Sequence, residues 1–427
     1  MPSEKSADYD QLIKNDRVHG RLYYDPAIFH DEMEKIWHRG WVYVGHESEV
    51  RVPGDYVTRP IGQTPVIMVR ANDHKVQLLV NRCRHRGNLV CQYERGNASY
   101  FRCDYHGWTY NTKGELIRVT YADGYGESFS KDSYGLVKVP RIATYRGFVF
   151  ASLQPTGISL EDHLGGAKEF IDMFVELSPL GEIELRAGAQ KVRYRGNWKL
   201  IVENSLEGTY HGPVLHQHFF DIAGSRMGVN RSSLAIAEQP GHIRYLPGGH
   251  MVEDFRGLRY KPGRFSVAIS PAGWQMYLAA MEGSYGKEQA RQKLEDRAQF
   301  IYVFPNLILL QTHVRRIQPV GVEETAVSYQ PALMKGAPEE INTARLREHE
   351  EVFGPAGFLS ADDLEICERN QIGVNVQVEE WLLISRGLKR EEVRADGVCV
   401  GYGTDEGQLR GLWRHYKEVM LPQESRG

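Results

Sequence analysis

Two short runs, CRHRGN at 83–88 and CDYHGWTY at 103–110, decide how this 427-residue sequence is interpreted. Each run holds one cysteine and one histidine: Cys83 with His85, and Cys103 with His106. Each pair follows a predicted strand and lies in a predicted turn that contains a glycine. Two such loops placed side by side would offer two thiolates and two imidazoles to one metal centre.

The order of the ligands separates two kinds of metal site. Structural zinc sites also use two cysteines and two histidines, usually with both cysteines in one pair and both histidines in the other. Here each pair mixes the two, as in a Rieske [2Fe–2S] centre, where the cysteines hold one iron and the histidines the other. Burial by chance could explain one such residue but not four at this spacing. The pattern favours the cluster over zinc.

The composition is that of a globular protein, with 41% hydrophobic and 25% charged residues. The length suggests two domains, or one domain with a large insert. A net charge of −3 gives no electrostatic case for binding nucleic acid. No run approaches the roughly 20 apolar residues of a membrane span, and no export signal is apparent. With five sparse cysteines, we expect a cytoplasmic protein with reduced thiols.

Hydrophobic periodicity divides the chain into a region of predicted β-strands and a region in which predicted helices dominate. From about Trp41 to Leu153, short β-rich runs alternate with turn residues. The expected strands lie at 41–45, 65–70, 76–82, 100–103, 108–111 and 147–153. Outside this region helical spacing dominates, with apolar strands at 300–320. The expected helices are 26–39, 159–178, 339–352, 361–384 and 405–420. The larger part is therefore a mixed α+β domain.

A second pair of histidines lies in GNWKLIVENSLEGTYHGPVLHQH at 196–218. His211 and His216 are five residues apart, a spacing that does not stack two side chains on one helical face. Gly212 and Pro213 lie between them, so we expect a helix to end there and the chain to bend. This is one way to build two corners of a 2-His-1-carboxylate iron site. Alone, the pair is a weak signal.

From about residue 20 to residue 420 the sequence resembles the large (alpha, terminal oxygenase) subunit of Rieske non-haem iron aromatic-ring-hydroxylating dioxygenases. CDYHGWTY is similar to the Cys-x-Tyr-His-Gly-Trp-x-Tyr run of their Rieske domain, and NWKLIVEN resembles the start of their iron-binding helix. The resemblance implies an α+β fold. An all-β Rieske domain, 38–155, is inserted near the start of a catalytic domain, 1–37 and 156–427, in which helices back an antiparallel sheet.

The resemblance also implies the ligands of both iron sites. Cys83, His85, Cys103 and His106 would bind the cluster, beside Trp108 and with Tyr110 as a hydrogen-bond donor; both aromatics could also be plain core residues. His211, His216 and Asp363 would bind Fe(II). Asp363 is the second acid of FGPAGFLSADDLEI at 353–366. Asp362 and His218 remain alternatives to Asp363 and His216.

The candidate catalytic residues are Glu207 and Asn204. Most relatives have an aspartate where this chain has Glu207, four residues before His211. That acid links the iron-ligand histidine to a cluster histidine of the neighbouring chain. The longer side chain can still reach the ring N–H from one helical turn away. The alternative is that Glu207 is only a solvated helix acid.

The implied reaction takes electrons from NADH through a separate reductase, with or without a ferredoxin, and adds both atoms of O2 to an aromatic ring. The chain has no G-x-G-x-x-G after a strand, so it depends on those partners for NADH. We expect a homotrimer, or an α3β3 assembly with a small subunit. Three rival functions remain open. They are a Rieske monooxygenase for single hydroxylation or demethylation, a ferredoxin-type electron carrier, and a zinc-stabilised interaction protein.

The substrate is the least determined feature. By position, Asn204, Ser205, Gly212, Val352, Phe353 and Leu359 should line the pocket. The FGPAGF segment and the end of the chain favour an aromatic acid of the benzoate, salicylate or terephthalate kind, and the alternative is a neutral or fused-ring aromatic. Four arginines could pair with a carboxylate: Arg193, Arg195, Arg226 and Arg231.

Overall fold

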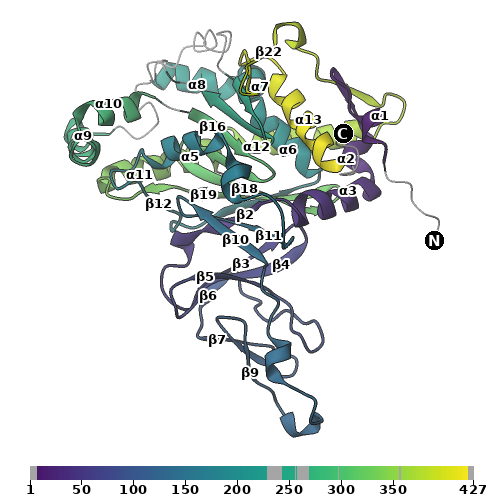
Figure 1. Ribbon diagram of the computed structural model, residues 1–427. Coiled ribbons are helices and arrows are strands. Elements are labelled where there is room, and N and C mark those ends of the chain that lie inside the picture. Colours follow the sequence, from purple (N-terminus) through teal and green to yellow (C-terminus); the bar gives the residue numbers. More distant parts are fainter. Residues whose placement is uncertain are drawn as a thin grey trace. The chain divides into compact units, whose positions relative to one another are not determined.

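The computed structural model describes residues 7–227, 243–254, 256, 269–296, 298–354 and 357–421. The chain forms two compact units. One is continuous, Trp37–Leu160, and the other combines the residues up to Ile36 with those from Glu161 onward. Figure 1 shows strands in the first unit and both strands and helices in the second. The predicted α+β class, with a β unit inserted near the start, is confirmed.

The inserted unit is built from three antiparallel sheets. The first contains β2 (Val42–His46), β10 (Arg141–Tyr145) and β11 (Phe148–Ser152). The second contains β3 (Asp55–Ile61), β4 (Thr64–Arg70), β5 (Val76–Val80) and β6 (Arg95–Asn97). The third contains β7 (Tyr100–Arg102), β8 (Thr109–Asn111) and β9 (Leu116–Arg118). The two Cys/His loops follow β5 and β7.

The second unit is organised around a nine-stranded antiparallel sheet in the order β13-β19-β18-β17-β16-β15-β14-β23-β22. Its longest strands are β18 (His313–Gly321) and β19 (Glu324–Pro331). The others are β13 (Gln190–Tyr194), β14 (Ile243–Leu246), β15 (His250–Asp254), β16 (Ala298–Val303), β17 (Leu307–Leu310), β22 (Glu392–Val393) and β23 (Cys399–Gly401). The predicted strands at 300–320 are β16, β17 and β18, and most of their apolar residues are buried.

Helices pack on this sheet and on one another. α5 (Ala167–Val175) contacts β15 and β16, α6 (Trp198–Leu206) contacts β18, and α13 (Gly407–Met420) contacts β14. α12 (Ser360–Val374) packs against α6, and Figure 1 shows these elements in teal, green and yellow. α3 (Pro26–Glu32) begins at the N-cap Asp25. α4 (Leu160–Leu164) and α11 (Glu339–Glu348) lie in the other predicted helical segments.

One predicted helix, 361–384, is too long. α12 ends at Val374, and Trp381–Leu383 form a strand, β21, that pairs with β1 (Arg17–His19). The indole of Trp381 packs edge-on against His19, with ring centroids 5.2 Å apart. Pairing with a strand distant in sequence overrides local helical spacing here. Among the described residues, no helix is long and apolar enough to cross a membrane.

Candidate metal sites

The two Cys/His loops have the same backbone geometry. The N–H of Gly87 donates to the carbonyl of Cys83 at 3.0 Å, and the N–H of Gly107 donates to that of Cys103 at 2.9 Å. In each loop the cysteine N–H donates to the carbonyl five residues further on, at 2.8 Å. Both glycines have positive φ, 78° and 71°, a conformation that favours residues without a Cβ. Equivalent turns therefore present one cysteine and one histidine each.

The four predicted cluster residues gather at these loops. Cys83 and Cys103 are free thiols, 1% and 2% exposed, in one hydrophobic cluster. The half-buried rings of His85 and His106 lie with centroids 4.6 Å apart. Nδ1 of His85 is buried without a hydrogen-bond partner. Two buried thiols and two adjacent imidazoles, one with an orphaned nitrogen, form a donor set that fits a [2Fe–2S] cluster.

Tyr110 and Trp108 contact these residues directly. The hydroxyl of Tyr110 lies 3.3 Å from Sγ of Cys83 and accepts a hydrogen bond from the N–H of Arg84 at 3.1 Å. Burial, reinforced by the neighbouring Cys83, raises the pKa of Tyr110. The hydroxyl therefore keeps its proton and can donate it to the sulfur. The indole of Trp108 stacks on His85, with ring centroids 5.0 Å apart and planes 10° apart.

In the second unit, His211, His216 and Asp363 bring three ligand atoms within 4.8 Å of one another. Oδ1 of Asp363 lies 3.5 Å from Nε2 of His211 and 3.1 Å from Nε2 of His216. Two atoms that each bind one metal ion at about 2.1 Å, at a right angle, are about 3 Å apart. The three side chains thus fit one ion and match a 2-His-1-carboxylate set.

A helix ends between the two histidines as predicted, but at Leu215 and not at Gly212 and Pro213. α7 (Gly208–Leu215) runs through Gly212 and Pro213, and the chain breaks at its two ends instead. Glu207 separates α6 from α7, and His216 is the C-cap of α7. Leaving the helix at His216 frees its ring to approach His211, with centroids 5.2 Å apart. Two histidines five residues apart can therefore bind the same metal ion.

The two alternative ligands lie further out. Oδ2 of Asp362 is 3.4 Å from Nδ1 of His216, the nitrogen that faces away from Asp363, and its side chain is 47% exposed. His218 is exposed. Burial opposes the ionisation of Asp363, but hydrogen bonds from His211 and His216 outweigh it and hold its pKa well below the usual range.

Asn204 and Glu207 flank the triad from the end of α6. The side-chain amide of Asn204 donates to Oδ1 of Asp363 at 3.1 Å. Burial, followed by the charges of Glu203 and Glu406, raises the pKa of Glu207 to about 8. The N–H of His211 donates to the backbone carbonyl of Glu207 at 3.1 Å. Among the described residues no hydrogen bond joins their side chains, and Nδ1 of His211 is buried without a partner. The bridge predicted between them is therefore not formed in this structure.

The predicted pocket residues lie on α6, on α7, on the segment before α12 and at the N-cap of α12. Gly212 and Ser205 are buried on α7 and α6, and Val352 and Phe353 are buried in the π-helical segment η6 (His349–Phe353). The half-buried Leu359 donates its N–H to the carbonyl of Val352 at 3.0 Å. Pro355 and Ala356 of the FGPAGF segment lie outside the described residues.

Of the four arginines suggested by the sequence, the structure describes the side chains of two, and both are exposed and paired with acids. The side chains of Arg193 and Arg195 are 68% and 88% exposed and pair with Glu324 and Glu368. The side chain of Arg226, and Arg231 as a whole, lie outside the described residues. Sequence reasoning missed a different arginine, Arg315 on β18, whose Nη1 donates to Oγ of Ser205 at 2.8 Å. Its only signal was its place in an otherwise apolar run.

Comparison with known proteins agrees with this geometry. Residues 40–140 match the family model of the Rieske [2Fe-2S] domain, and residues 182–421 match that of the ring hydroxylating alpha subunit catalytic domain. The chain is 34% identical to the anthranilate 1,2-dioxygenase large subunit of Acinetobacter baylyi over 87% of this chain and 80% of that protein. It is 31% identical to the 2-halobenzoate 1,2-dioxygenase large subunit of Burkholderia cepacia, over 90% and 84%.

Solved structures show the same architecture. Naphthalene 1,2-dioxygenase from Rhodococcus sp., bound to indole, superposes with a TM-score of 0.79 at 26% identity, covering 95% of both chains. Together, the matching family models and the similarity to these large subunits show that the chain belongs to the ring-hydroxylating dioxygenase alpha subunits, Rieske non-haem iron enzymes with a [2Fe–2S] cluster and a mononuclear iron.

Proposed function

We propose that this chain is the terminal oxygenase component of a multicomponent dioxygenase that cis-dihydroxylates an aromatic carboxylic acid. The observation that carries the reaction class is the presence, in one chain, of two Cys/His loops and a buried His211, His216 and Asp363 set. Three relatives support the substrate class. The 2-halobenzoate and anthranilate enzymes and the toluate 1,2-dioxygenase of Pseudomonas putida are 30–34% identical to this chain.

In this proposal each unit has a separate task. The cluster is held by Cys83, His85, Cys103 and His106. Tyr110 donates a hydrogen bond to Sγ of Cys83. His211, His216 and Asp363 hold the iron, which when bound supplies the activation of O2. Asn204 keeps Asp363 oriented through its hydrogen bond to Oδ1. A hydrogen-bonded partner of this kind fixes a ligand's rotamer and tunes its basicity.

Glu207 connects the iron site to its electron source. The orphaned Nδ1 of His211 needs an acceptor, and Glu207 occupies the break between α6 and α7 one turn away. We propose that its carboxylate accepts this N–H in the assembled enzyme and links His211 to a cluster histidine of a neighbouring chain. That role implies a trimer of this chain, with or without a small subunit. Electrons come from NADH through a reductase or ferredoxin in the cytoplasm, where the free thiols would stay reduced.

The test is turnover of the iron-loaded enzyme with a generic reductase–ferredoxin pair, NADH and ¹⁸O₂. Benzoate, anthranilate, salicylate and terephthalate are compared with benzene, biphenyl and naphthalene. A cis-diol, or the catechol formed from it, that carries two labelled oxygens from an acid supports the proposal. One labelled oxygen in a singly hydroxylated product would instead identify a Rieske monooxygenase. Two labelled oxygens only in neutral arenes would retain the reaction and reject the substrate class.

A further inference from the structure

Arg315 is a buried cation without an anionic partner. It lies on β18 and is 2% exposed. Its Nη1 donates to Oγ of Ser205, while its buried Nε has no hydrogen-bond partner. No carboxylate of the described residues lies within ion-pair distance of it. Removing a guanidinium from water without supplying an anion is strongly unfavourable, so this arrangement requires an explanation.

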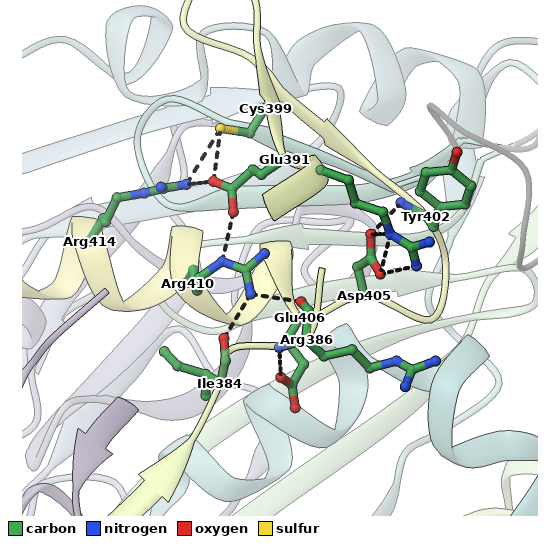
Figure 2. Close-up of polar contacts among 10 residues, drawn as sticks. Ile384, Arg386, Glu391, Cys399, Tyr402, Asp405, Glu406, Arg410 and Arg414 are labelled. Atoms are coloured by element: carbon green, nitrogen blue, oxygen red, sulfur yellow. Dashed lines mark hydrogen bonds and ion pairs between the residues drawn. The ribbon is translucent and has the colours of Figure 1, made fainter. Parts of the chain in front are cut away.

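Two other buried arginines of this chain, Arg59 and Arg410, are paired with acids. Arg59 is held by Glu49 at 2.8 Å. Arg410 donates through Nε to Glu391 at 2.7 Å and through Nη1 to two backbone carbonyls. Figure 2 shows this arrangement, with Glu391 between the guanidinium groups of Arg410 and Arg414. The fold therefore supplies carboxylates to these two buried arginines, whereas no carboxylate of the described residues pairs with Arg315.

Two buried histidines beside Arg315 also lack partners. His313 and His349 are both 0% exposed, with ring centroids 4.9 Å apart, and none of their four ring nitrogens makes a hydrogen bond. Burial, and after it the charge of Arg315, lowers the pKa of His349 to about 4. Burial, followed by the neighbouring His349 and Arg315, lowers the pKa of His313 well below its usual value. Each ring is therefore neutral and offers one donor and one acceptor.

The ring of Tyr329 connects the arginine to the histidines. The guanidinium carbon of Arg315 lies 4.8 Å from its centroid, and the ring of His313 lies 5.6 Å from it. The hydroxyl of Tyr329 is also buried, and the side chain of Ser360 lies close to it. Buried polar groups are nearly always satisfied in native proteins. The unpaired Nε of Arg315 and the four unpaired ring nitrogens of His313 and His349 therefore indicate that a bound polar group provides their hydrogen-bond partners.

This cluster adjoins the proposed catalytic site. Ser205, which accepts from Arg315, is next in sequence to Asn204, which donates to the ligand Asp363. The ring of His313 packs against Phe353, a predicted pocket residue, with centroids 4.9 Å apart. All these residues belong to the same compact unit. A group bound at Arg315 would therefore be attached to a molecule that also reaches the triad.

We propose that Arg315, assisted by His313 and His349, binds the carboxylate of the aromatic acid and so sets which ring edge faces the triad. This inference rests on the proposed function. A carboxylate supplies the missing negative charge and accepts from Nε of Arg315 and from an imidazole N–H, and guanidinium–carboxylate pairs are strong and directional. Of the remaining imidazole nitrogens, the second N–H can donate to the carboxylate or to water, and the two unprotonated nitrogens can accept from water or from a donor substituent on the ring. The alternative is that Arg315 serves only to hold Ser205 in place. That role needs Nη1 alone and does not explain the unpaired Nε of Arg315 or the unpaired ring nitrogens of His313 and His349.

The test compares Arg315→Gln with wild type in the iron-loaded enzyme, using benzoate and its uncharged carboxamide. Glutamine keeps a donor for Ser205 but removes the charge. We expect kcat/KM for benzoate to fall about 100-fold, the typical effect of removing one partner of a buried charge pair, and that for the carboxamide to change less than about threefold. Excess benzoate should raise the Tm of wild type but not of Arg315→Gln. Arg291→Gln, at an exposed pair on α10 (Lys287–Glu295), is the matched control and should behave as wild type.

A second pair of variants tests the histidines. His349→Leu should lower kcat/KM for benzoate about 10-fold, since hydrogen bonds to charged groups are stronger than neutral ones, and His349→Gln should restore part of it through its amide N–H. Equal losses for benzoate and benzamide in Arg315→Gln, or a loss of bound iron, would assign Arg315 a structural role and overturn the inference. Benzoate turnover within threefold of wild type would also overturn it. A wild-type enzyme that oxidises arenes but no acid would instead reject the proposed substrate class.

Discussion

The side-chain amide of Asn204, at the end of α6, donates a hydrogen bond to Oδ1 of Asp363, at the start of α12, across 159 positions of sequence. The same carboxylate oxygen faces Nε2 of both His211 and His216. One short contact therefore joins α12, which supplies Asp363, to α6, the helix that precedes the histidine-bearing α7. It also fixes the rotamer of the single carboxylate among them.

Asn204→Ala should weaken iron binding. Without the amide, Asp363 loses a donor and its preferred orientation, and losses of this kind typically reduce metal affinity or activity 10–100-fold. Iron retained after dialysis against a chelator is the direct measurement. Asn375→Ala, an exposed asparagine just beyond α12, should retain wild-type iron. If wild type, Asn204→Ala and Asn375→Ala retained equal amounts of iron, Asn204 would have no role in iron binding.

Tyr110→Phe should lower the reduction potential of the Rieske cluster. The hydroxyl, 3.3 Å from Sγ of Cys83, stabilises the more negative reduced state, and one hydrogen bond of about 1 kcal/mol corresponds to about 40 mV for a one-electron couple. Spectroscopic redox titration measures the change. Tyr93→Phe, whose side chain is exposed, should leave the potential unchanged. An unaltered potential in Tyr110→Phe would make Tyr110 a packing residue.

Glu207→Gln should separate cluster reduction from product formation. The cluster should still accept electrons, because Glu207 belongs to the other unit, while product formation falls 10–100-fold as expected for an outer partner of a metal ligand. Glu207→Asp should retain more activity, since it keeps a carboxylate. Stopped-flow reduction and single-turnover product yield measure the two steps. Full single-turnover yield in Glu207→Gln would show that the carboxylate is not part of the electron path.

Glu253 should make the stability of the protein depend on pH. Burial raises its pKa to about 7, partly offset by its hydrogen bond with Thr209, whereas an unfolded glutamate titrates near 4.3. The folded state therefore holds an extra proton between these values. The contribution to stability is fully present below about pH 4.3 and is lost as pH rises through 7.

Glu253→Gln removes this titration while keeping an acceptor for Thr209. Relative to wild type, the variant should gain stability on the order of 2 kcal/mol between pH 5 and pH 8. Urea unfolding at several pH values measures the difference. Glu282→Gln, on the helix α9 (Pro271–Tyr285), should show no such trend. A difference between variant and wild type that is constant with pH would mean that Glu253 is ionised throughout.

The local parts of both proposed sites could be predicted from sequence. The Cys/His loops are short segments whose turns are set by Gly87 and Gly107, so spacing alone identified them. Asp363 lies 147 positions after His216 and was placed only through resemblance to a family. The helix break was misplaced because Gly212 and Pro213 suggested an interruption that occurs at Glu207 and His216 instead.

The polar cluster around Arg315 could not be predicted, because it depends on sheet register. Arg315 pairs with Tyr329 across β18 and β19, and His349 reaches His313 from a separate helical segment. In the sequence, His313 and Arg315 are polar residues in an apolar strand, a pattern equally typical of solvent-facing positions. Only the assembled sheet shows that both are buried.

The central claim is that one chain holds both iron centres, and metal analysis combined with EPR tests it most directly. We expect about three irons and two acid-labile sulfides per chain, with the EPR signal of a Rieske cluster after dithionite reduction. His211→Ala should retain the sulfide and the signal and lose about one iron. Zinc without sulfide, or an EPR-silent reduced protein, would contradict the account.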